Sequence, residues 1–128
     1  SIERRAEMLA EAASISESAH EIGNVLLVMG KGAEKKVNSI MQRIFTQNNQ
    51  IEPKLEDEEC RNHLQEVKER AVRFKEAFAN YILSKENEDR MLQSLEDFQN
   101  ACHEFHADQS SDMLSTQSTA TSMMGIVT

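Results

Sequence analysis

Apolar side chains recur along most of the chain in alternating steps of four and three residues. In the first half they stand at Met8, Ala12, Ile15, Ala19, Ile22, Leu26, Met29 and Ala33, then at Val37, Ile40 or Met41, and Ile44. This is the heptad spacing of helices packed along one apolar seam. It predicts a first helix over residues 2–46, a rod of roughly 65 Å. Gly30 and Gly32 are the positions where this helix is least stable. They indicate a bend, a site where another helix approaches closely, or a local loss of helix stability that the fold tolerates.

Two further seams follow a turn predicted at residues 47–54, where polar side chains and Pro53 end the first pattern. Their apolar members are Cys60, Leu64, Val67, Ala71, Phe74 and Phe78, then Met91 or Leu92, Leu95, Phe98, Cys102 and Phe105. Residues 84–89 between them are all polar.

These polar residues leave two architectures open. If residues 84–87 form a turn, the chain is a three-helix up-down-up bundle. If the helix continues, it is an antiparallel helical hairpin that needs a second copy to make a four-helix bundle. Both alternatives are all-α, and the polar stretch favours the turn.

Residues 108–122 are mostly Ser, Thr, Gln and Asp, with few apolar side chains. Such a composition buries too little surface to offset the entropy lost on ordering. The sequence therefore predicts a helical bundle domain over residues 1–108 and a flexible Ser/Thr/Met-rich tail over residues 109–128.

Composition and charge narrow the class of protein. One Pro, four Gly and no Trp leave long helices as the natural outcome. With 14 Lys plus Arg against 22 Asp plus Glu, the net charge of -8 disfavours nucleic acid and favours protein partners. No apolar run approaches the roughly 18 to 20 residues that span a bilayer, so no membrane insertion is expected. The start of the chain lacks the apolar segment of a signal peptide, and a cytoplasmic location is the simplest inference.

Residues 18–29 contain polar side chains of chemically active types, spaced so that they are neighbours on a helix. Because Ala19 and Ile22 belong to the seam, His20, Glu21 and Asn24 should face outward as neighbours on the helix surface. A neutral imidazole there is a nucleophile near pH 7. A glycine inside a helix costs roughly 1 kcal/mol against Ala, so Gly23 suggests that something approaches closely. An ordinary solvated helix face carries such polar residues as well.

The run from His20 to Leu26 resembles the H-box of sensor histidine kinases. The pattern of that family is His, an acidic residue, two variable positions, Asn or Thr, then usually Pro and Leu, and Val25 stands where Pro is usual. The resemblance implies that His20 accepts a phosphoryl group. It also implies that Glu21 and Asn24 assist transfer to, or dephosphorylation of, the aspartate of a response-regulator receiver domain.

Two functions from different classes therefore stand side by side. The first is a dimeric two-component signalling module that transfers a phosphoryl group through His20, with Gly23, Val25, Leu27 and Val28 forming the surface that binds the partner. The chain has no phosphate-cradling glycine loop, so the phosphoryl group would come from another molecule. The second is a non-enzymatic helical bundle that binds a partner helix or filament through the apolar run at residues 25–29 or through the tail.

A metal site is a further hypothesis. Cys60 and His63 in the second seam region, and Cys102 and His106 in the third, have ligand-like spacings. An antiparallel pair that turns near residue 85 would bring positions 60 and 63 level with about 109 and 106, and zinc is then the candidate ion. Both cysteines lie on apolar seams, however, where free Cys behaves as a small hydrophobe. No cofactor is therefore expected, with zinc at these four residues as the alternative.

Overall fold

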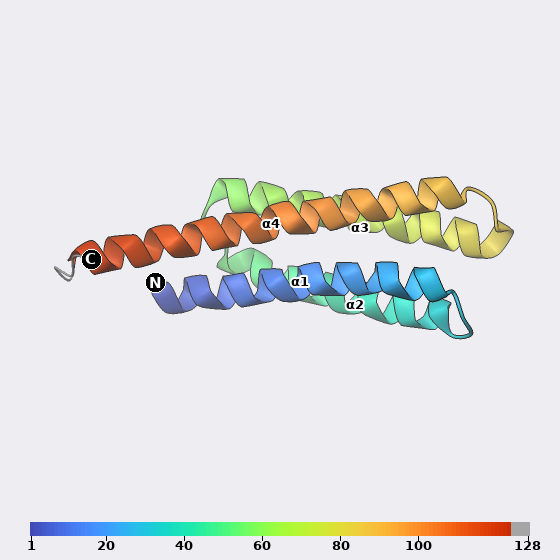
Figure 1. Cartoon of the computed structure of the whole chain (residues 1–128). Coiled ribbons are helices and arrows are strands. Elements are labelled where there is room, and N and C mark those ends of the chain that lie inside the picture. The colour runs from blue at the N-terminus through green and yellow to red at the C-terminus, as the bar shows by residue number, and fades with distance from the viewer. Residues whose placement is uncertain (124–128) are drawn as a thin grey trace.

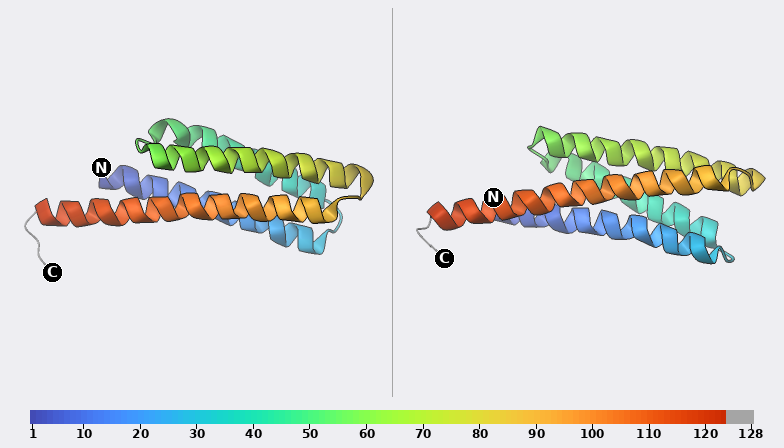
Figure 2. Two further views of the ribbon diagram at one scale, coloured as in Figure 1. Left: turned by 90° about the horizontal axis from the view of Figure 1, so that it is seen from above. Right: turned by 45° about the horizontal axis from the view of Figure 1, so that its top comes forward.

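The computed structural model describes residues 1–123, and within them every regular element is a helix. The helices are α1 (Ile2–Val28), α2 (Ala33–Ile51), α3 (Glu58–Ser84) and α4 (Glu88–Met123), with a short 3-10 helix η1 (Glu52–Lys54) between α2 and α3. They run up, down, up and down as one elongated bundle (Figures 1 and 2). α4 packs closely on both α1 and α3, whereas α2 packs only sparsely on α3. The predicted all-α fold is confirmed.

The predicted first helix is in fact two helices. α1 ends where Met29 adopts a left-handed backbone (φ 41°) and its N–H bonds the carbonyl oxygen of Val25 at 2.9 Å. Gly32 precedes α2 at φ 86°, a conformation that glycine adopts without strain. The chain reverses here, so the prediction of a continuous rod to residue 46 is wrong. The apolar spacing continues across the loop into a second helix, which is why the pattern alone did not show the reversal.

Of the other two predicted turns, one is confirmed, and the one expected at residues 47–54 is helical over most of its length, so the chain turns later. The turn at residues 84–87 is confirmed, because α3 ends at Ser84 and α4 begins at Glu88, with Lys85 and Asn87 at positive φ. Between α2 and α3 the helix continues to Ile51, and Pro53 lies in η1. Asp57 then starts α3, since its side chain accepts a hydrogen bond from the backbone N–H of Glu59 at 3.3 Å.

All four helices bury their predicted seams in one core. Its buried members include Met8, Ala12, Ile15, Ala19, Ile22, Leu26, Val37, Ile40, Met41, Ile44, Cys60, Leu64, Val67, Ala71, Phe74, Phe78, Met91, Leu95, Phe98, Cys102 and Phe105. The Phe74 ring stacks on Phe78 and Phe98, with centroids 5.8 and 6.4 Å away. One chain supplies all four helices, so no second copy is needed to cover these seams.

The helix α4 extends well past the expected domain boundary. Gln109 is only 1% exposed, and Arg5 Nη1 donates to Asp112 Oδ2 at 3.2 Å across the α1–α4 contact. The predicted start of a tail at residue 109 therefore falls inside α4, and residues 124–128 lie outside the described part. No helix of residues 1–123 is both long enough and apolar enough to cross a membrane.

Candidate functional site

His20 lies on the outer side of α1, next to two polar neighbours. Its side chain and those of Glu21 and Asn24 are exposed, while Ala19 and Ile22 on the same turns are fully buried. The three polar residues line a hollow of about 620 Å³ between α1 and α2. The outward placement expected for this group is thus the one the structure has.

Arg43 of α2 is the member of this hollow that sequence reasoning missed. Its Nη2 donates to Ser18 Oγ at 3.1 Å and to Glu21 Oε2 at 3.2 Å. The arginine adds a positive charge that suits an anionic group, and it orients the Glu21 carboxylate. In a continuous rod Arg43 would lie far from His20, so only the reversal at Gly32 brings the two together.

Gly23 faces the interior contact between α1 and α4. A Cβ atom at this position would lie 3.2 Å from Nε2 of Gln99, which donates to the carbonyl oxygen of Ala19 at 3.1 Å. The close approach that the glycine suggested is therefore made by α4 of the same chain.

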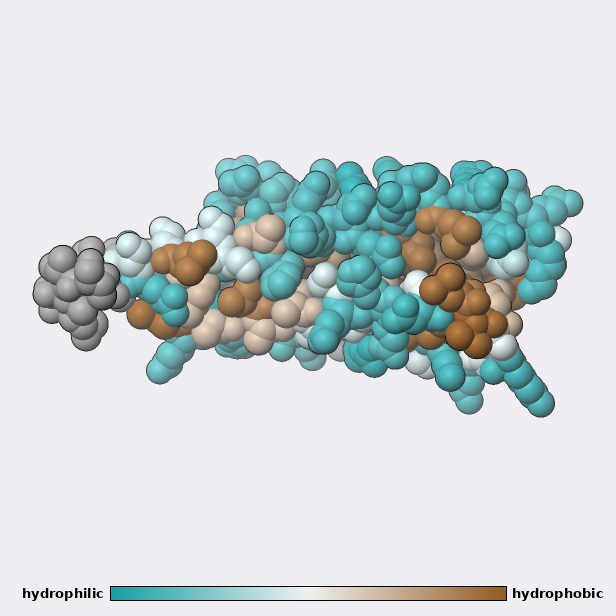
Figure 3. All heavy atoms as spheres, in the orientation of Figure 1, coloured by the Kyte–Doolittle hydropathy of each residue, from teal (hydrophilic) through white to brown (hydrophobic). Residues whose placement is uncertain are grey.

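Large apolar side chains are exposed at the end of the bundle where α1 ends. Leu27 is 86% and Val28 80% exposed, and Leu92 at the start of α4 is 42% exposed. Val25 is partly buried against the core. Figure 3 shows apolar atoms gathered on this end of the face formed by α1 and α4. We call Val25, Leu27, Val28 and Leu92 the apolar end.

Basic residues of the α1–α2 loop and of α2 flank the apolar end. Lys31 and Lys36 line a hollow of about 250 Å³ whose floor includes Val25 and Val28. Lys36 also lines a neighbouring hollow of about 560 Å³, together with Lys35, Arg43 and Val25. Four basic residues and one acidic residue, Glu21, thus line the hollows beside Val25 and Val28, although the chain as a whole carries a charge of -8.

The four residues considered as metal ligands do not form one group. Cys102 is fully buried, and desolvation raises its pKa to about 12. Cys60 instead groups with Asp57 and Asp112, and His63 with Glu59 and Asp108, the potential ligand atoms in each group lying within 4.8 Å of one another. Among residues 1–123, neither group includes Cys102 or His106.

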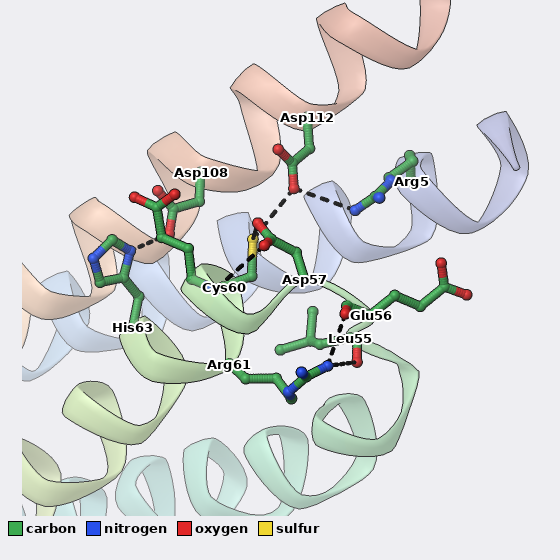
Figure 4. Close-up of polar contacts among 10 residues, drawn as sticks. Arg5, Leu55, Glu56, Asp57, Cys60, Arg61, His63, Asp108 and Asp112 are labelled. Atoms are coloured by element: carbon green, nitrogen blue, oxygen red, sulfur yellow. Dashed lines mark hydrogen bonds and ion pairs between the residues drawn. The ribbon is translucent and has the colours of Figure 1, made fainter.

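Figure 4 shows how these two groups bridge the start of α3 and the middle of α4. Cys60 Sγ lies 3.2 Å from Asp112 Oδ2 and 3.4 Å from Asp57 Oδ2. Burial, followed by the contact with Asp112, raises the pKa of the Cys60 thiol. His63 Nδ1 pairs with Asp108, and that hydrogen bond raises the pKa of His63.

Sequence reasoning missed the aspartates of these groups, although two signals were present. Asp57 precedes Cys60 by three residues at a helix start, and Asp108 and Asp112 are four apart on one helix face. The expected helix register was close, because Cys60 lies beside both Asp112 and Gln109, and His63 pairs with Asp108 rather than with position 106.

No family model, curated protein or solved structure matches this chain. The resemblance to the H-box therefore rests on residues 20–26 alone.

Proposed function

We propose that this chain is a non-enzymatic interaction module that binds an amphipathic helix of a partner protein at its apolar end. The observation that carries the proposal is the exposure of Leu27 and Val28, at 86% and 80%. Fully burying a side chain of this kind contributes about 1.5 to 3 kcal/mol. Two adjacent residues of the apolar end thus offer substantial binding energy to a partner that covers them.

The charge around the apolar end indicates the chemistry of that partner. Lys31, Lys35 and Lys36 are exposed beside the hollows that include Val25 and Val28. A helix that lays apolar residues on this floor and carries Glu or Asp along its flank would match both features. Charge complementarity of this kind favours fast association and selects against basic partners.

The binding test uses a labelled amphipathic peptide with leucines at helical spacing and glutamates on both flanks. We expect fluorescence anisotropy to detect binding, and the double change Leu27→Asp with Val28→Asp to weaken it at least about tenfold. Leu114→Asp is the matched control, since Leu114 is 67% exposed in the last third of α4. The end of α4 lies opposite the end of α1 in the bundle (Figure 1). Circular dichroism checks that each variant is folded. No binding by the parent chain, or equal binding by the double variant, contradicts the proposal.

A second candidate function is phosphoryl transfer through His20. It is supported by the exposed imidazole, which shares a hollow with Asn24 and the guanidinium of Arg43. A ring nitrogen of His20 would attack the phosphorus of a receiver's phosphoaspartate. The N–P bond forms as the P–O bond breaks, and the aspartate leaves as a carboxylate. Arg43 would pair with the phosphoryl oxygens, while Asn24 positions a water molecule for hydrolysis.

Incubation with a receiver domain carrying labelled phosphate tests this second function. We expect label on the parent chain or faster loss of label from the receiver, and neither with His20→Gln. Asn24→Ala should slow hydrolysis while leaving labelling of the chain intact. The same His20→Gln variant should bind the acidic peptide normally, which separates the two functions. An unlabelled chain together with unchanged receiver dephosphorylation contradicts the transfer function.

The predicted homodimer and cytoplasmic location stay predictions that belong with these functions. A four-helix core formed within one chain leaves the apolar end, rather than an unfinished seam, as the surface available for self-association. Sedimentation equilibrium of the parent chain and the Leu27→Asp, Val28→Asp variant distinguishes a dimer at this surface from a monomer.

A further inference from the structure

The thiol of Cys60 is surrounded by more hydrogen-bond acceptors than its single proton can serve. Oδ2 of Asp112 and Oδ2 of Asp57 lie 3.2 and 3.4 Å from its sulfur. Only one of the two carboxylates can accept the thiol proton. Because Cys60 is only 2% exposed, bulk water does not separate the other carboxylate from the sulfur. A divalent cation in place of the thiol proton would attract all three groups at once.

Gln109 gives a second, independent indication at the same place. The residue is 1% exposed, and neither atom of its amide has a hydrogen-bond partner among the described residues. Its side chain reaches Cys60, where it opposes the rise in the pKa of the thiol. Leaving a buried polar group unpaired is destabilising. The amide N–H is the group that lowers the pKa of the thiol, and the carbonyl oxygen of the same amide has no partner. A rotation of the amide would therefore bring this oxygen beside the sulfur as a ligand atom.

We propose that Asp57, Cys60, Asp112 and Gln109 form a Zn²⁺ site between the start of α3 and the middle of α4. Zinc prefers four ligands in a tetrahedron, with bonds of roughly 2.0 to 2.3 Å to carboxylate oxygen and thiolate sulfur. The ligand atoms of the first three residues lie within 4.8 Å of one another, so small shifts are enough to close them around an ion. Binding breaks the S–H bond of Cys60, forms an S–Zn bond, and releases the proton to water.

The surrounding charges suit this ion. A thiolate and two carboxylates carry three negative charges, which are balanced by Zn²⁺ together with Arg5, whose Nη1 donates to Asp112 at 3.2 Å. Cys60 also lies in the first turn of α3, and a helix N-terminus stabilises a thiolate.

Neighbouring contacts hold the ligands in position before an ion arrives. The other oxygen of Asp57, Oδ1, accepts from the backbone N–H of Glu59 at 3.3 Å. Arg61 donates to the carbonyl oxygens of Leu55 and Glu56 at 3.0 and 2.8 Å, which fixes the loop that delivers Asp57 (Figure 4). Such outer contacts orient ligands and strengthen metal binding.

Titration with Co²⁺ alone tests the site, because Co²⁺ bound to a thiolate gives a sulfur-to-metal charge-transfer band. We expect the band to saturate at one ion per chain, to disappear when Zn²⁺ is added, and to be absent in Cys60→Ser. Cys102→Ser is the matched control, since that buried cysteine belongs to neither ligand group. His63→Gln should also retain the band, because His63 pairs with Asp108.

The isosteric change Asp112→Asn keeps the test decisive if Cys60→Ser fails to fold. We expect it to weaken Zn²⁺ binding at least about tenfold in competition with a chromophoric chelator. No charge-transfer band in the parent chain, a band retained by folded Cys60→Ser, or unchanged affinity in Asp112→Asn overturns the proposal. The start of α3 lies at the opposite end of the bundle from the end of α1 (Figure 1), so failure of the zinc site leaves the peptide-binding proposal untouched.

Discussion

Gln99 of α4 donates its side-chain amide to the backbone carbonyl oxygen of Ala19 in α1 at 3.1 Å. The glycine one turn further on leaves room for this contact, since a Cβ at Gly23 would lie 3.2 Å from the same nitrogen and would push it back by a few tenths of an ångström. The Ala19 carbonyl is also within reach of the helical N–H of Gly23, so Gln99 adds a second bond to it. A side chain of α4 thus explains a glycine that is costly in the middle of a helix.

Gly23→Ala should stabilise the chain more when Gln99 is absent. Alanine gains roughly 1 kcal/mol of helix propensity, and we expect nearly that full gain in a Gln99→Ala background. In the parent chain the gain should be smaller, because Gln99 must move away from Ala19. Urea unfolding of the four chains of this double-mutant cycle measures the coupling. Equal gains in both backgrounds would contradict the contact.

Phe74→Ala should be among the most destabilising single changes. The side chain is fully buried and stacks on both Phe78 and Phe98. Truncating such a residue costs about 3 to 5 kcal/mol of unfolding free energy. Val72→Ala is the control two residues away, at 44% exposure, and should change stability by less than about 0.5 kcal/mol. A similar loss in both variants would argue against the aromatic core.

The pairing of His63 with Asp108 predicts a pH-dependent contribution to stability. The hydrogen bond to Asp108 raises the pKa of His63 above its ordinary value of 6.5, so the folded chain holds the proton more tightly than the unfolded chain. The contribution is fully present below 6.5 and is lost as the pH rises through the raised folded pKa. We expect the difference in unfolding free energy between the parent and His63→Gln to shrink accordingly.

The exposed His103 provides the control for this pH series. His103→Gln should leave the pH dependence of stability close to that of the parent chain. A His63→Gln effect that is constant, or that grows as the pH rises, would exclude the proposed role of the pair.

Cys102 should resist alkylation in the folded chain. Because the thiolate is the reactive form, a pKa raised to about 12 by burial leaves almost none of it near neutral pH. In a Cys60→Ser background, we expect mass spectrometry to detect iodoacetamide adducts rapidly in urea and only slowly in buffer. Rapid labelling without denaturant would show that the packing of the bundle around α4 does not shield this residue.

The seams were predictable from sequence because helix periodicity is a local property. Residues such as Ile15, Phe74 and Phe98 could be assigned to the core from spacing alone. The reversal between α1 and α2 could not, because Ala33 and Val37 continue the same spacing on the next helix. The glycines at 30 and 32 were the available signal, and the positive φ of Gly32 explains it.

In the candidate sites too, features set by one helix were predictable from sequence, and features set by contacts between helices were not. The exposure of His20 follows from the seam on its own helix, so sequence reasoning reached it. The partners supplied by other helices, Arg43 beside Glu21 and Asp112 beside Cys60, depend on how the helices pair and on their register. Gln109 was assigned to a tail on composition, yet the contact of α4 with the rest of the bundle buries it.

The sparse packing of α2 on α3 leaves a groove of about 650 Å³, lined by Met41, Phe45, Phe78 and Ile82 among others. Of the four helices, α2 therefore has the least to lose by separating from the remaining three. Its backbone amides should exchange hydrogen for deuterium sooner than those of α4, which lies between two close neighbours. Such an opening would pivot at Gly30 and Gly32, and it would uncover an apolar stripe of α2 that the closed bundle hides.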